Sequence, residues 1–141
     1  VETASSLPGA PGELSLYATE KYWHGNGSVL RRYTLRLDGF VSASAGWKGG
    51  SLLTHPIIFK GNRLELNFST SAAGSLRVEI QDQNGDPLPG FSLEDCPSFF
   101  GDSVEKSIIW NNNTNLSSFV GQTVQLCFEL KDADLYSFRF Q

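Results

Sequence analysis

The sequence predicts an all-β protein, a two-sheet antiparallel β-sandwich of jelly-roll type. Apolar and polar residues alternate with a period of two in several segments, which is the pattern of half-buried strands. No helical periodicity of comparable length occurs. Fourteen Gly and six Pro among 141 residues supply frequent chain reversals. A chain of this length holds one ordinary core, so we expect a linker over residues 1–12 and a single sandwich domain over residues 13–141.

The linker and the weaker strands follow from local composition. Residues 1–12 are small, rich in Pro and Gly, and without periodicity. Trp110 shares a face with Val104 and Ile108 and is expected in the core. Weaker strand patterns cover five segments, namely Glu13 to Thr19, Leu30 to Leu37, Phe40 to Ala45, Pro56 to Phe59 and Val104 to Trp110.

Four segments, residues 63–69, 75–81, 123–130 and 135–140, show the clearest alternation and supply most of the predicted core. The pair Asn84–Gly85 after the second segment favours a turn, because both residues tolerate a positive φ. The predicted inward residues are Leu64, Leu66 and Phe68; Leu76, Val78 and Ile80; Val124, Leu126, Phe128 and Leu130; and Tyr136, Phe138 and Phe140.

The charge distribution argues against a nucleic-acid partner. The formal net charge is -4 and the sequence pI is near 5.1, whereas nucleic-acid binders usually carry a dominant basic face. Residues 1–63 hold seven Lys or Arg against four acids, and residues 64–141 hold four against eleven. The excess of Lys and Arg in residues 1–63 is compatible with an acidic ligand such as a sulfated or uronic-acid glycan. No stretch approaches the roughly 20 apolar residues of a membrane span, no signal-peptide pattern opens the chain, and Val1 without any Met suggests an excised module.

The cysteines and the acidic residues give few metal or redox signals. Cys96 and Cys127 allow one disulfide, although two unpaired thiols are the favoured interpretation, and their spacing is not that of a zinc site. Calcium prefers several oxygen ligands, so the acidic segment with Glu94, Asp95 and Asp102 allows a structural Ca²⁺. The alternative is an acidic loop that is solvated or caps its own backbone. No cofactor is required.

Two tryptophans are the best candidates for ligand contact. Trp47 and Trp23 lie in Gly-flanked polar segments, and loops are where a sandwich concentrates its binding groups. An exposed indole offers a flat face for a sugar ring, while polar neighbours bond the hydroxyls. The alternative is that each Trp caps an end of the core. The proposed polar partners are Tyr22, His24, Arg32, Arg36 and Lys48, where the two arginines share one strand face with Thr34 and have acids across the sheet as alternative partners.

Catalysis is not predicted. Glu79, Glu105 and Glu129 occupy outward strand positions, and two carboxylates at roughly 5–9 Å would suffice for glycoside hydrolysis. Outward Glu usually only faces solvent, and no GxSxG nucleophile motif occurs.

A series of motifs resembles the C-terminal β-sandwich of bacterial proteins related to glycoside hydrolase family 32. The motifs are ELSLYATE from Glu13, LRRYTLRLDGFVS from Leu30, STSAAGS from Ser69, RVEI from Arg77, GFSLEDC from Gly90, GD at Gly101 and ADLYSF from Ala133. In those proteins the sandwich follows a five-bladed propeller that carries the catalytic acids. The resemblance transfers no ligand-binding residue.

The resemblance implies an accessory module of a larger bacterial enzyme that is secreted or periplasmic. We therefore expect a non-catalytic carbohydrate-binding module that holds an attached glycoside hydrolase near polysaccharide. The alternative is a structural accessory domain that packs against a catalytic propeller and stabilises it. A broad apolar patch would favour packing, whereas a narrow aromatic strip among polar groups would favour sugar binding.

Overall fold

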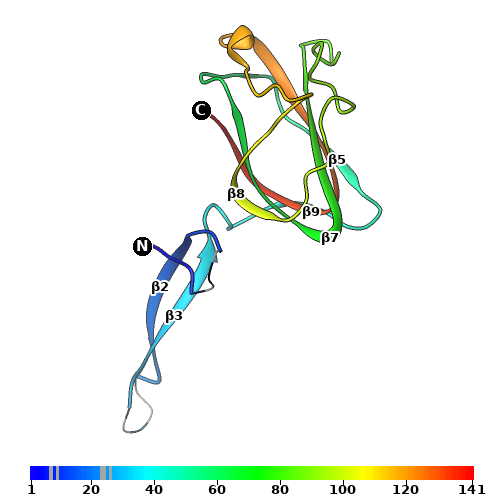
Figure 1. Cartoon of the computed structure of the whole chain (residues 1–141). Helices are drawn as coiled ribbons and strands as arrows, with labels where there is room; N and C mark the ends of the chain where they lie inside the picture. Colours follow the sequence, from blue (N-terminus) through cyan, green and yellow to red (C-terminus); the bar gives the residue numbers. More distant parts are fainter. Residues whose placement is uncertain (7, 9, 23–24, 26) are drawn as a thin grey trace. The chain divides into compact units, whose positions relative to one another are not determined.

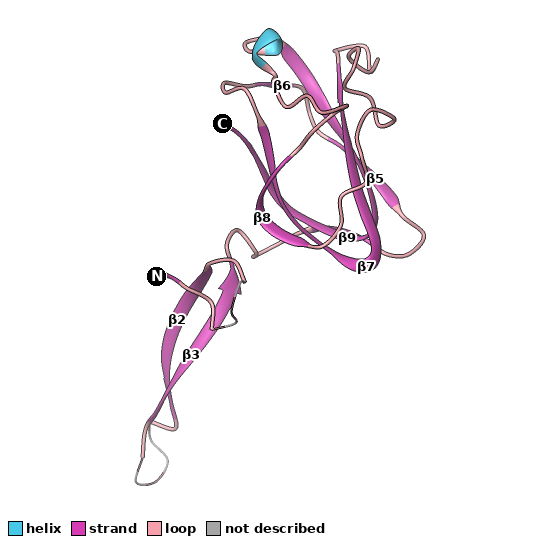
Figure 2. Ribbon diagram, viewed as in Figure 1, coloured by secondary structure: helices cyan, strands magenta, loops and turns pink. Residues whose placement is uncertain are grey.

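A computed structural model describes residues 1–141 except residues 7, 9, 23, 24 and 26. The chain forms two compact units, Val1–Val41 and Ser42–Gln141, which we describe separately. The all-β, antiparallel class is confirmed: the one helical element of the described residues is a short 3-10 turn, η1 (Ser117–Phe119), as Figure 2 shows. The arrangement is consistent with a sandwich, while the jelly-roll type is not confirmed.

The first unit is a three-stranded antiparallel sheet in the order β1-β2-β3. β1 (Glu2–Thr3) lies within the segment expected to be a linker, whereas β2 (Glu13–Glu20) and β3 (Val29–Arg36) lie where strands were predicted. β2 and β3 pair residue by residue from Glu13↔Arg36 to Glu20↔Val29. Ser15 is the one buried residue among those described in this unit, so the sheet carries no apolar core of its own.

The second unit is built on two long strands, β7 (Leu64–Gln81) and β9 (Thr123–Phe140). They pair antiparallel along nearly their whole length, and both curve strongly (Figure 1). β8 (Asp102–Ser107) pairs with β7. Three shorter strands pair with β9, namely β4 (Ala43–Ala45), β5 (Gly50–Leu53) and β6 (Ile57–Ile58).

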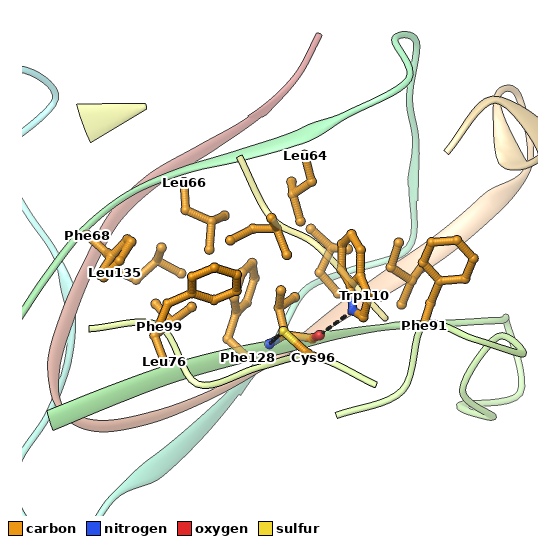
Figure 3. Close-up of a cluster of buried hydrophobic side chains, with 14 of the residues drawn as sticks. Leu64, Leu66, Phe68, Leu76, Phe91, Cys96, Phe99, Trp110, Phe128 and Leu135 are labelled. Atoms are coloured by element: carbon orange, nitrogen blue, oxygen red, sulfur yellow. Dashed lines mark hydrogen bonds between the residues drawn. The ribbon is translucent and has the colours of Figure 1, made fainter. Parts of the chain in front are cut away.

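The β7–β9 ribbon bends where its pairing is interrupted. Thr70 pairs with Ala133 and Ser75 with Lys131, so four residues of β7 stand opposite Asp132 alone. Such a bulge bends a strand and increases its twist. Gly74 lies at this bend, and a Cβ there would approach Asp132 O to 2.4 Å. Because of the bend, both halves of β7 contribute to one core: Leu64 and Leu66 come from one half and Leu76 from the other (Figure 3).

The predicted core is largely confirmed, with one correction. The predicted inward residues of 64–68, 76–80 and 124–130 and the Trp110 side chain are all buried. In the last segment, Ala133 and Leu135 are buried, whereas Tyr136 is only partly buried and lies outside the core cluster. The reason is a register shift: Phe68 pairs with Leu135 and Asn67 with Ser137, so that a bulge at Tyr136 changes which side chains of β9 point inward. Phe138 and Phe140 pack against the core but are not fully buried.

The second half of β7 pairs with β9 on one side, and a non-strand segment of residues 87–99 covers its other edge. Leu76 and Phe99 exchange both backbone hydrogen bonds at 2.9 Å, and Ile80 bonds to Leu88 and Phe91. Between them, the Val78 N–H donates to Cys96 Sγ at 3.5 Å. Figure 3 shows this contact within the core. Both Cys96 and Cys127 are free thiols, as favoured from the sequence.

Candidate functional site

Trp47 lies in the turn between β4 and β5, two strands that pair with successive stretches of β9. The turn is closed by a hydrogen bond of 2.9 Å from Gly49 N–H to Gly46 O. Gly49 has φ 78°, and a Cβ there would lie 3.2 Å from Leu130 O, so the turn requires a glycine at this position. Trp47 is 62% exposed and is not part of the core. The structure therefore places this indole on a loop, where its face is accessible to a ligand.

Lys131 of β9 contacts one face of the Trp47 ring. Its Nζ atom lies 4.2 Å from the ring centroid, which is a close cation–π contact. The next residue, Asp132, donates its N–H to Gly46 O at 3.1 Å and so ties the turn to β9. These contacts hold the turn and the indole against β9.

A shallow depression of about 470 Å³ is lined by Lys131 and by Lys48, the residue that follows Trp47, and we call it the Trp47 depression. It forms where β5 pairs with β9, with Ser51 opposite Glu129 in the register. Its polar and apolar lining groups come from the β4–β5 turn and the start of β5, from β9 and from the loop after β7. The lining residues are Lys48, Gly49, Gly50, Ser51, Leu93, Cys127, Glu129, Leu130 and Lys131.

An ion pair fixes the one carboxylate that lines the Trp47 depression. Arg77 Nη2 lies 2.5 Å from Glu129 Oε2, and Arg77 Nη1 donates to Leu93 O at 3.4 Å. Cys127 lies on the same face, and burial, assisted by Glu79 and Glu129, raises the pKa of its thiol. At neutral pH Cys127 is therefore a neutral, weakly nucleophilic group, which suits a binding surface better than a reactive site.

The structure brings together two of the residues predicted to bind ligand, Trp47 and Lys48. Tyr22, Arg32 and Arg36 belong to the first unit, and Trp23 and His24 lie outside the described residues. Sequence reasoning missed Ser51 and Lys131 and considered Glu129 for catalysis alone, because nothing local to β9 indicates that it pairs with the strands on either side of the Trp47 turn.

Arg32 is occupied by contacts within the first unit. Its Nε donates to Ser15 Oγ at 2.8 Å, and its Nη2 lies 2.6 Å from Glu13 Oε1 and 2.9 Å from Thr3 Oγ1. The guanidinium thus fastens β1 to the β2–β3 hairpin. Pairing with acids across the sheet was the alternative interpretation for this residue.

The acidic segment forms a hydrogen-bonded loop. Asp95 Oδ2 accepts from the Ser92 hydroxyl at 2.7 Å and from the Ser92 N–H at 3.1 Å, while Asn111 donates to Oδ1 at 2.5 Å. The Ser92 hydroxyl, the Ser92 N–H and the Asn111 amide hold the pKa of Asp95 below its usual value. Glu94 is exposed, and Asp102 begins β8. No three His, Cys, Asp or Glu side chains gather to hold a metal in the part of the chain that is described, and a structural calcium remains a prediction.

The three outward glutamates considered for catalysis each have a protein partner. Glu105 pairs with Arg139 at 3.0 Å and Glu129 pairs with Arg77. Glu79 is 8% exposed and accepts from Gln81 Nε2 at 2.6 Å and from Leu93 N–H at 3.1 Å. These contacts give each carboxylate a structural role.

Comparison with known proteins returned no match to a family model, a curated protein or a solved structure. Among the described residues, no helix is long and apolar enough to cross a membrane.

Proposed function

We propose that the chain is a non-catalytic carbohydrate-binding module of a glycoside hydrolase and that it binds polysaccharide at the Trp47 depression. The observation that carries this proposal is the exposed Trp47 indole in contact with Lys131, which lines a depression together with Lys48, Ser51 and Glu129. The attachment to a secreted or periplasmic bacterial hydrolase rests on the resemblance to family 32 accessory modules.

The proposed mechanism combines stacking with hydrogen bonding. A pyranose places its axial C–H groups on the exposed part of the Trp47 indole, and this contact contributes apolar burial without requiring a deep pocket. Lys48 and Ser51 then supply hydrogen-bond donors to hydroxyl groups, and Glu129 supplies an acceptor. An open surface of this kind suits a polymer, because chain ends need not enter it.

The test is a glycan panel measured by affinity electrophoresis, with and without chelator, on the wild type and on Trp47→Ala. We expect retardation on at least one polysaccharide class and its loss in Trp47→Ala. Phe100→Ala is the matched control, because Phe100 is an aromatic residue of the same unit that is 71% exposed and does not line the depression. Sensitivity to chelator would support the predicted calcium. Equal retardation of Trp47→Ala and the wild type, with unchanged circular dichroism, would contradict the proposal.

The first unit favours a second candidate function, packing against a catalytic propeller domain as a structural accessory. Leu16 and Tyr33 face each other across β2 and β3 and are 66% and 45% exposed, and Val29 on the same face is 46% exposed. A small sheet with an exposed apolar face and no apolar core of its own is marginally stable alone, so a covering partner would stabilise it.

Calorimetry of the parent enzyme tests this candidate. If the hairpin packs on the propeller, the double change Leu16→Ser and Tyr33→Ser should lower the melting temperature of the propeller. Thr19→Ser, an exposed substitution on the opposite face of β2, serves as the control. A propeller transition that is unchanged in the double variant would contradict this function.

A further inference from the structure

The charges of the Trp47 depression are unbalanced in favour of cations. Glu129, the one carboxylate in its lining, is already paired with Arg77. Lys48 and Lys131 also line it, and neither forms an ion pair with any residue that the structure describes. The two ammonium groups therefore lack an anionic partner within the depression.

The acids closest in sequence to the lining do not supply that partner. Asp132 and Glu94 flank Lys131 and Leu93 in the chain but do not line the depression. Glu79 lies behind the lining, buried, and its two oxygens accept hydrogen bonds from Gln81 and from Leu93 N–H. The Lys131 ammonium instead lies over the Trp47 ring, whose negative face attracts it without neutralising its charge.

We propose that the Trp47 depression selects anionic polysaccharide, with a carboxylate or sulfate group placed against Lys48 and Lys131. This inference rests on the proposed sugar-binding function and names the class of its ligand. Lysine acts toward both groups as a point charge with three donors, so uronate and sulfate share this chemistry. A general attraction of polyanions to the chain does not explain such binding, because the net charge is -4.

The test uses two pairs of polysaccharides in which both members have the same backbone and one member carries anionic groups, with binding measured by isothermal titration calorimetry. Polygalacturonate is compared with its carboxyl-reduced form, and dextran sulfate with dextran. We expect the charged member of at least one pair to bind more tightly, with an affinity that falls as salt rises because exposed charges are screened. Which pair responds identifies the anionic group.

Lysine substitutions locate the effect. Lys48→Gln and Lys131→Gln should each weaken binding of the charged ligand roughly 2- to 5-fold, the range of exposed ion pairs. Lys131→Arg should restore binding because it keeps the charge. Lys106→Gln is the matched control, since Lys106 also lies over an aromatic ring, that of Phe99, at 5.6 Å, and the variant has the same net charge.

The two proposals fail in different ways. Equal binding of the charged and neutral members, lost in Trp47→Ala, would overturn the anionic selectivity and leave the sugar-binding function in place. Weakening by Lys106→Gln equal to that by Lys48→Gln would also overturn the selectivity. If no member of either pair and no glycan of the panel binds, both proposals are overturned.

Discussion

The indole Nε1 of Trp110 donates a hydrogen bond of 2.8 Å to the carbonyl oxygen of Val78. The N–H of the same Val78 donates to the thiol of Cys96. Val78 lies at an edge of β7. Two residues before and after it, Leu76 and Ile80 form hydrogen bonds with backbone groups of the segment 87–99. Two side chains thus replace the missing strand at this position, and an edge that would otherwise be open for pairing with another chain is closed.

The Trp110–Val78 bond predicts a large effect of a conservative substitution. Trp110→Phe keeps an aromatic ring in the core but removes the donor, which leaves the buried Val78 carbonyl unsatisfied and creates a small cavity. We expect a loss of about 2–4 kcal/mol in the free energy of unfolding, measured by urea denaturation. Trp47→Phe, at an exposed position, should stay within about 0.5 kcal/mol of the wild type. Similar losses in the two variants would show that the indole N–H of Trp110 contributes nothing specific.

The bend of the β7–β9 ribbon predicts that Gly74 does not tolerate a side chain. A Cβ at this position would meet Asp132 O at 2.4 Å and Lys131 O at 2.9 Å, and both are backbone atoms. Gly74→Ala should therefore destabilise the second unit by about 1–3 kcal/mol, as overpacking does. Thermal unfolding followed by circular dichroism measures this loss. Gly46→Ala is the control, because a Cβ there meets nothing within 4 Å; a Gly74→Ala variant as stable as this control would refute the expectation.

The hydrogen bonds of the Asp95 loop should make the free energy of unfolding depend on pH in the acidic range. Hydrogen bonds from Ser92 and Asn111 lower the pKa of the folded carboxyl relative to its ordinary value of 3.8. As the pH falls, the Asp95 carboxyl of the unfolded chain is therefore protonated before that of the folded chain. The stabilisation from these hydrogen bonds is present above pH 3.8 and is lost as the pH falls through the lower pKa of the folded state. Asp95→Asn should be less stable than the wild type at neutral pH and should lose less stability on acidification. Glu94→Gln, at the exposed neighbour, should follow the wild-type pH profile, and an Asp95→Asn profile parallel to wild type would contradict this account.

The two thiols are expected to resist alkylation to different degrees. Burial raises the pKa of both groups, which lowers the thiolate fraction on which alkylation depends. Cys127 is partly exposed and should react with iodoacetamide more slowly than a fully exposed thiol of ordinary pKa. Buried Cys96 should react only on unfolding. Mass spectrometry of the Cys127→Ser and Cys96→Ser variants separates the two rates. Rapid labelling of Cys96 in the native protein would show that residues 87–99 do not stay packed on β7.

Alternation in the sequence predicted the inward faces well, because a strand with one buried face must repeat its apolar residues every second position. Leu64, Leu66 and Phe68 show this, as do Leu76, Val78 and Ile80, and all six are buried. The two groups were predicted as separate strands, since residues 70–74 lack the pattern, yet they belong to one bent strand. Tyr136 was misplaced because a bulge changes the inward parity, and alternation alone does not reveal a bulge.

Of the candidate site, only the turn that carries Trp47 and Lys48 could be predicted from the sequence. The Gly-flanked turn around Trp47 indicated an exposed indole, and Lys48 follows it in the chain. Lys131 and Glu129 come from β9, and their place beside Trp47 depends on pairing with β5. That strand begins with Gly50 and Ser51, which have weak strand propensity, so the sequence of 50–53 gave no strand pattern.

The bent ribbon has a consequence for how the second unit opens. β7 and β9 each run through both halves of the bend, and their pairing extends from Leu64↔Phe140 to Gln81↔Gln125. Side chains of both halves pack in one core, so we expect neither half to detach while the other stays intact. Amide protons on the two sides of Gly74 should therefore exchange with solvent at one common, global rate. Pairing strands so far apart in sequence also carries a high entropic cost before any contact forms, so this unit should fold slowly and in a single cooperative step.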